Sequence, residues 1–119
     1  MYSMPEDTGT IPGGKEEAMF TAKELQSIDR SYFRVIGCSC FAVTLQSRNT
    51  GHCWHILQHE YRNFSTCTIC HTHHYGTAYH EHGHAATLAL CIRQIVSHDT
   101  WWLNRQTFRR SHAHQKTYS

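Results

Sequence analysis

Hydrophobic and polar residues alternate along the middle of the chain. Phe41, Val43 and Leu45 occupy every second position, and the alternation resumes at Trp54 after the turn residues Asn49-Thr50-Gly51. A period of two is typical of strands that bury one face. Two such runs joined by a short Gly-containing turn predict a β-hairpin.

Two further segments have strand character. Residues 32–37 are rich in aromatic and β-branched side chains, and residues 66–73 alternate again. In the second segment, one face would carry Cys67, Ile69, His71 and His73. Residues 61–64 fit a turn before it, whereas residues 79–84 show neither a clear helical nor a clear strand period. The pattern therefore predicts a sheet of three or four antiparallel strands.

A short helix is predicted over Ala22–Ile28. Thr21 and Glu24 have the spacing of a capping box, in which each side chain accepts a hydrogen bond from the other residue's backbone N–H. Phe20 and Leu25 have the spacing of the hydrophobic staple that accompanies such a cap.

A second helix is predicted from Thr87 to His98. It carries apolar residues at helical spacing, which form a stripe able to cover one face of a sheet: Leu88, Cys91, Ile92, Ile95 and Val96. We expect this helix to end at His98, Asp99 to cap a following turn, and the tryptophans at 101 and 102 to cover the same core.

These elements predict an α+β domain, in which a three- or four-stranded antiparallel meander packs against a C-terminal helix and a short N-terminal helix precedes the sheet. We expect a flexible leader over residues 1–14, one domain over 15–108 and a basic mobile tail over 109–119.

Charge and composition narrow the class of protein. The net charge is +2, but residues 32–119 hold eight Lys and Arg against three acidic residues, together with all twelve histidines. There is no apolar run long enough to span a membrane and no pattern of a secretory signal, so we expect a cytoplasmic protein without a membrane partner. Its six cysteines are then expected to be reduced thiols or metal ligands.

The stretch from Cys67 to His84 contains two cysteines and six histidines, a composition that suggests zinc. The candidate ligands are soft or borderline donors: Cys67, Cys70, His71, His73, His80 and His82. On a strand His80, His82 and His84 would share one face and could converge on one ion. The alternative is a group of partly exposed imidazoles that binds metal only adventitiously, in which case the protein has no cofactor.

The same stretch contains Cys67-Thr-Ile-Cys70-His71, the pattern of covalent haem attachment. We expect no haem, because an alternating strand would point the two thiols to opposite faces and because no export signal is visible.

A basic and aromatic group of residues surrounds the predicted hairpin: Arg48, His52, Trp54, His55 and Arg62. Cationic groups hold phosphates and exposed aromatic rings stack on bases, so this face suggests nucleic-acid binding. Equally, Trp54 could belong to the core and the charges to a solvated surface.

The sequence assigns no catalytic residue. A Cys–His pair could act as a nucleophile, but spacing along the chain does not show which groups meet. The sequence favours a small binding module for nucleic acid or protein over an enzyme. A zinc-stabilised structural module and a small metal-dependent hydrolase are the alternatives.

Four segments resemble a group of short uncharacterised bacterial proteins, often from mobile elements, over about residues 32–105. They are Ser47–Ile56, Cys70-His-Thr-His73, Tyr79-His-Glu-His82 and Ser97-His-Asp99. The resemblance implies no activity. It implies that one set of residues matters more than Cys67 and Cys70: His52, Trp54, His71, His73, Tyr79, His80, His98 and Asp99.

Overall fold

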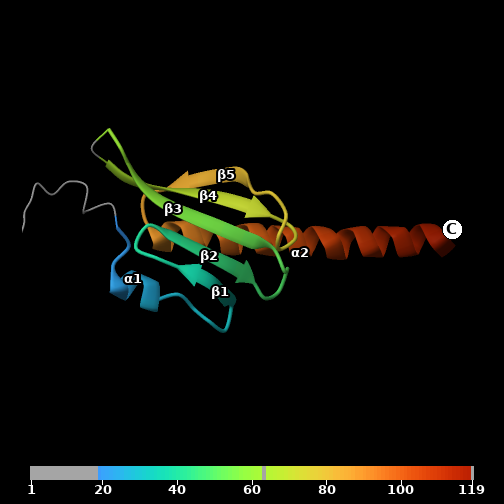
Figure 1. Ribbon diagram of the computed structural model, residues 1–119. Helices are drawn as coiled ribbons and strands as arrows, with labels where there is room; N and C mark the ends of the chain where they lie inside the picture. Colours follow the sequence, from blue (N-terminus) through green and yellow to red (C-terminus); the bar gives the residue numbers. More distant parts are fainter. Residues whose placement is uncertain (1–18, 63, 119) are drawn as a thin grey trace, which may run out of the picture.

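The computed structural model describes residues 19–62 and 64–118, which form one antiparallel sheet and two helices (Figure 1). The strands follow one another across the sheet in the order β1-β2-β3-β4-β5. The elements are α1 (Ala22–Gln26), β1 (Phe33–Cys38), β2 (Ala42–Ser47), β3 (Cys53–Tyr61), β4 (Phe64–Thr72), β5 (His80–Ala85) and α2 (Leu88–Tyr118). The predicted α+β class is confirmed, with five strands instead of three or four.

The additional strand is β5, in the segment without a clear period. Its sequence, His-Glu-His-Gly-His-Ala, lacks apolar residues larger than alanine, so side-chain alternation could not reveal it. Backbone pairing with β4 forms it instead. A bulge in that pairing, between Ile69 and Cys70, shifts the register halfway along β5.

The predicted hairpin joins β2 and β3, with Leu45 opposite Trp54 and Val43 opposite Ile56. Gly51 in its turn has φ +78°, a backbone conformation that glycine adopts without steric cost. The second predicted turn joins β3 to β4, where Tyr61 pairs with Phe64.

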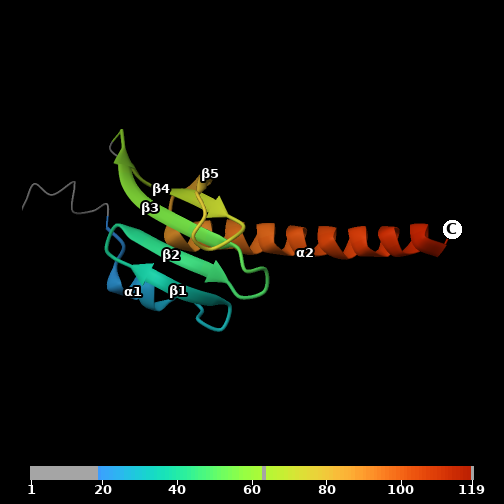
Figure 2. The same ribbon diagram turned by 45° about the vertical axis from the view of Figure 1, so that its right-hand side comes forward.

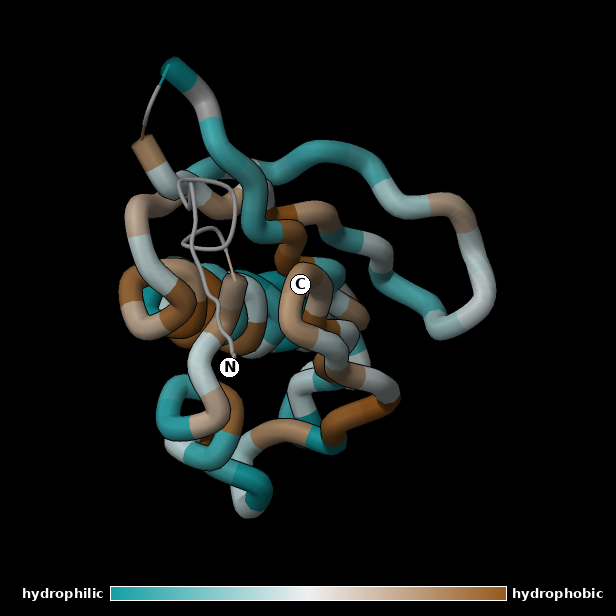
Figure 3. The backbone as a smooth tube through the Cα atoms, turned by 60° about the vertical axis from the view of Figure 1, so that its left-hand side comes forward, coloured by the Kyte–Doolittle hydropathy of each residue, from teal (hydrophilic) through white to brown (hydrophobic). Residues whose placement is uncertain are grey.

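Helix α2 covers one face of the sheet, and the core lies between the two layers (Figure 2). Most hydrophobic stretches of the chain lie toward the middle of the molecule, whereas the loops at its edges are largely hydrophilic or neutral (Figure 3). The larger buried side chains come from both layers: Phe33, Val43, Leu45, Trp54, Ile56, Ile69, Leu88 and Ile95.

The capping box at α1 is confirmed. The Thr21 hydroxyl accepts a hydrogen bond from the Glu24 backbone N–H at 3.0 Å, and the Glu24 carboxylate accepts one from the Thr21 N–H at 2.9 Å. The helix ends at Gln26, two residues before the predicted Ile28. The Phe20 side chain is buried in the core, as expected for the staple.

The predicted end of the second helix is wrong. Helix α2 does not stop at His98 but runs without a break to Tyr118, through the segment predicted as a tail. Asp99 does not cap a turn, because its carboxylate is buried and accepts hydrogen bonds from Tyr32 and Thr50. No proline or glycine follows to interrupt the helix. The predicted leader over residues 1–14 lies outside the described residues.

Among the described residues, no helix combines the length and the apolar character that a membrane crossing requires.

Candidate metal centre

Five histidines and one aspartate converge where β4 and β5 meet α2. His71 lies in β4 and His82 in β5, whereas His52 and His73 lie just outside the ends of β3 and β4. Helix α2 contributes His98 and Asp99. We call these six residues the histidine cluster.

Within the described residues, the cluster contains three sets whose candidate ligand atoms all lie within 4.8 Å of one another. The sets are His52–His71–His73, His71–His82–His98 and His52–His98–Asp99. Any two of them share one histidine. The three sets are therefore best regarded as alternative positions for a single ion.

Hydrogen bonds distinguish the three sets. In the first, two of the three members are bonded to each other, with Nε2 of His71 3.0 Å from Nδ1 of His52. In the third, one Asp99 oxygen accepts from Tyr32 at 2.7 Å and the other from Thr50 at 3.1 Å.

His98, which belongs to the second and third sets, has a buried nitrogen, Nδ1, without a hydrogen-bond partner. Buried polar atoms normally have partners, so this nitrogen needs an explanation. A metal ion bound to Nδ1 of His98 would provide the explanation, because it would use the lone pair of this nitrogen.

The strand period and the helix period bring the cluster together. His71 follows Cys67 and Ile69 on the face of β4 that the helix covers, and all three are buried. On α2, His98 lies three residues after the buried Ile95 and seven after Cys91, so the helical repeat points it toward the same face.

Two tryptophans form the walls of the cluster. The Trp54 ring is fully buried and stacks on His71, with ring centroids 4.1 Å apart. The Trp102 ring lies 4.8 Å from His52 and 4.8 Å from His73. On the sides that they cover, such apolar walls keep water away and strengthen electrostatic interactions.

Loss of solvation favours the neutral form of four imidazoles, those of His52, His71, His82 and His98. It lowers the pKa of His71 to about 3 and the pKa of His52 to about 4, with neighbouring histidines adding to both effects. Burial also lowers the pKa of His82 and of His98. Neutral imidazole is the form that binds metal, so these side chains are ready to act as ligands at neutral pH.

A hydrogen-bond network holds the Asp99 side chain in place within the cluster. The Tyr32 hydroxyl donates to Asp99, and burial together with this hydrogen bond raises the pKa of Tyr32 to about 12. The tyrosine therefore stays protonated and remains a donor at neutral pH. The Asn49 amide donates to the Tyr32 oxygen at 3.3 Å, which ties the hairpin turn to the same network.

The cluster is open to solvent at two places. A cavity of about 370 Å³ adjoins His52 and His73 and is also lined by Tyr75 and Trp102. A second cavity of about 580 Å³ adjoins His82 and is also lined by Arg93. An ion could enter beside the exposed His82, and three imidazole ligands would leave a fourth coordination position for water.

The structure brings three of the predicted metal ligands together: His71, His73 and His82 belong to the cluster. His80 lies near His71, with ring centroids 5.3 Å apart, but belongs to none of the three sets. Cys67 is buried against Cys91, a contact that raises the pKa of Cys91.

Cys70 does not lie with Cys67. The two thiols are on opposite faces of β4, and Cys70 is only partly buried, opposite His55 of β3. The pair therefore cannot converge on one ion without rearrangement of the strand.

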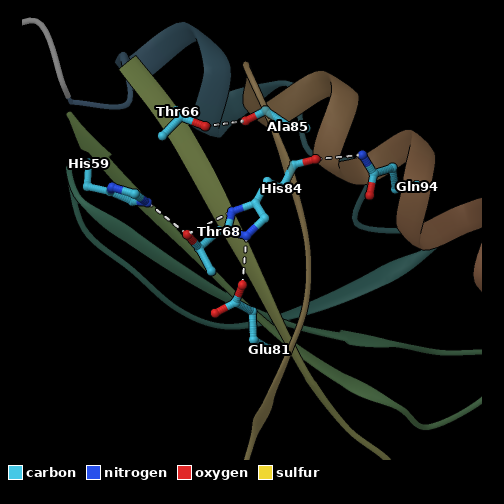
Figure 4. Close-up of polar contacts among 7 residues, drawn as sticks. All are labelled: His59, Thr66, Thr68, Glu81, His84, Ala85 and Gln94. Atoms are coloured by element: carbon cyan, nitrogen blue, oxygen red, sulfur yellow. Dashed lines mark hydrogen bonds and ion pairs between the residues drawn. The ribbon is translucent and has the colours of Figure 1, made fainter. Parts of the chain in front are cut away.

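The expectation that His80, His82 and His84 share one face is wrong. The bulge separates them: His82 faces α2, whereas His84 lies on the outer face of the sheet (Figure 4). There, His84 Nε2 is 2.7 Å from the Glu81 carboxylate and its Nδ1 is 3.3 Å from the Thr68 hydroxyl. These contacts give both of its ring nitrogens partners.

The residues predicted to bind nucleic acid are spread over several environments. His52 and Trp54 are buried, and Trp54 Nε1 donates to the Ser47 hydroxyl at 3.0 Å, so neither ring is exposed for stacking on a base. His55 is half-buried and bonds the Thr44 hydroxyl at 2.7 Å. Arg48 and Arg62 are exposed.

Pattern analysis did not select His98 and Asp99 as ligands. Their residue types were compatible, and the resemblance pointed to them, but a helix end at His98 appeared to explain both. The helical spacing from Ile95 to His98 could have placed His98 on the buried face. His98 and His71 are far apart in the sequence, so spacing along the chain did not reveal that their rings meet.

No family model matches this chain, and no curated protein or solved structure matches it either.

The lowered pKa values predict how stability depends on pH. Because His71 and His52 have lower pKa values in the folded state than unfolded, protonation favours unfolding. The stability of the metal-free protein is therefore complete above about pH 6.5 and falls as the pH drops toward about 4, by about 1.4 kcal/mol per pH unit for each histidine. Urea unfolding at successive pH values measures this. A free energy of unfolding that stays constant from pH 7 to about pH 5 would contradict it.

Proposed function

We propose that this protein binds one zinc ion per chain in the histidine cluster, with His71, His82 and His98 as ligands. The observation that carries the proposal is the convergence of three imidazoles from three separate elements, one of them with a buried, unpartnered nitrogen. A surface that binds metal only adventitiously would have solvated rings. Here His71 is 2 % exposed, and its ring stacks on a buried tryptophan.

The donor set favours zinc among the common metals. Imidazole nitrogen suits zinc, copper, iron and nickel, whereas calcium and magnesium prefer oxygen. Three histidines with one further position complete the four ligands that zinc takes. His52 would support this site from outside, because its Nδ1 lies 3.0 Å from His71 and fixes the orientation of that ring.

The six cysteines are unpaired, with Cys53, Cys67 and Cys91 buried. Free thiols fit a reducing compartment, and we propose that the protein acts in the cytoplasm.

Metal analysis of the untagged protein tests the proposal. Protein purified without any nickel column is dialysed against a weak chelator and its zinc content is measured. We expect about one zinc per chain, because a site whose three ligands are already held together by the fold stays filled. Protein that has been stripped by a strong chelator should have a lower melting temperature than the zinc-bound protein.

Two results would reject a native site. One is a zinc content below about 0.2 per chain after expression in zinc-supplemented medium. The other is an unchanged melting temperature when stoichiometric zinc is added to stripped protein.

A further inference from the structure

The second half of α2 extends beyond the sheet. Figures 1 and 2 show the helix continuing past the ends of the strands, so no strand covers it there. From residue 103 to residue 110 every side chain except Gln106 is exposed. The part of α2 after Trp102 is about 24 Å long, since each helical residue adds about 1.5 Å.

This projecting half is strongly basic. It contains Arg105, Arg109, Arg110 and Lys116, whereas the whole of α2 has a single acidic residue, Asp99. Asp99 is fully buried and therefore does not reduce the positive charge at the surface. The helix thus presents a concentrated positive charge that lacks an acidic counterpart of its own.

Exposed aromatic rings accompany the arginines. Trp101 is 52 % exposed and Phe108 is 60 % exposed. They lie seven residues apart on one side of the helix, about 10 Å along its axis. That distance is about three times the 3.4 Å spacing of stacked nucleotides. The guanidinium of Arg105 lies over the Trp101 ring, 5.4 Å from its centroid, between the two aromatic positions.

We propose that the projecting half of α2, together with Trp101 at its base, binds single-stranded nucleic acid, with the arginines holding phosphates and Trp101 and Phe108 stacking on bases. This surface adjoins the zinc site at one point, where the Trp101 ring lies 5.6 Å from the ring of His98, but the proposal does not depend on the metal. Charge complementarity selects a polyanion, and exposed rings beside cations are the combination that single-strand binders use.

An anionic membrane is the competing partner, and the distribution of charge disfavours it. A helix that lies on a membrane needs a broad apolar face opposite its cations. Here Arg105, Arg109 and Arg110 fall at different angles around the helix and are interleaved with the exposed apolar side chains. Among the side chains described from residue 101 to residue 110, no continuous apolar face remains for insertion.

Fluorescence anisotropy of a labelled single-stranded oligonucleotide of about 20 nucleotides tests the proposal on the full chain. The helix variant combines Arg105→Ala, Arg109→Ala and Arg110→Ala. We expect it to bind at least about tenfold more weakly and its salt dependence to decrease by about two in slope, because three phosphate contacts are lost. Trp101→Ala alone should weaken binding about tenfold.

A hairpin variant, Arg48→Ala with Arg62→Ala, serves as the comparison, since it removes two exposed arginines from turns of the sheet. Retained binding by this variant supports the helix as the binding surface. Binding lost in the hairpin variant but kept in the helix variant overturns the proposal. So does wild-type protein that binds vesicles containing phosphatidylserine but not the oligonucleotide. Unchanged far-UV circular dichroism in every variant shows that the fold is intact.

Discussion

His71→Phe is expected to weaken zinc binding by at least about 100-fold, because it removes a ligand that belongs to two of the three possible donor sets. The phenylalanine ring keeps the shape of the side chain and its stacking on Trp54, so the fold should be retained. Competition with a zinc-binding dye measures the affinity, and circular dichroism checks the fold.

His84→Phe is the matched control. It makes the same chemical change on the outer face of the sheet, where His84 contacts Glu81 instead of the cluster (Figure 4). We expect its zinc affinity to equal that of the wild type. Equal affinities in the His71 and His84 variants would show that zinc does not bind at the cluster.

Two more variants select among the donor sets. If His71–His82–His98 holds the ion, His82→Phe loses zinc and His73→Phe keeps it. The opposite result would move the ion to the His52–His71–His73 set. The proposed zinc site would then have the right cluster but the wrong ligands.

Trp54→Ala is expected to lower the free energy of unfolding by about 4 kcal/mol, because it leaves a cavity in the core where Trp54 is 0 % exposed. It also removes the donor to the buried Ser47 hydroxyl, which lies 3.0 Å from Trp54 Nε1. Urea unfolding measures the change.

Trp101→Ala provides the comparison for that loss. Trp101 is 52 % exposed, so the same truncation should cost less than about 1 kcal/mol. Similar losses of unfolding free energy in the two variants would contradict the placement of Trp54 in the core. The comparison also separates two roles of tryptophan here: Trp54 stabilises the fold, whereas Trp101 is proposed to contact a partner.

The buried Trp54 and the exposed Trp101 also show how much the pattern of residues along the chain can predict about burial. The alternation around Trp54 predicted a strand correctly but did not reveal which face the second layer would cover. For that reason Trp54 and His52 fitted a nucleic-acid surface in the sequence, although both are buried. The proposed single-strand surface lies instead on α2, and only its last part, from Arg109, falls in the segment predicted as a tail.

The sequence by itself determined the elements with strong local periods. The capping box at Thr21, the hairpin around Gly51 and the apolar stripe of α2 are all marked by the spacing of residues close in the chain. Local interactions of this kind leave their spacing in the sequence, so the α+β class followed from them.

Only the tertiary structure decided the rest. Strand β5 exists because β4 offers it backbone hydrogen bonds, and those are independent of side-chain type. The histidine cluster joins residues from 52 to 99, and it forms because the sheet bulge turns His82 inward while the helix brings His98 over His71. Whether the ligands converge depends on how α2 packs against the sheet. The spacing of residues along the chain does not give the distance between the helix and the sheet.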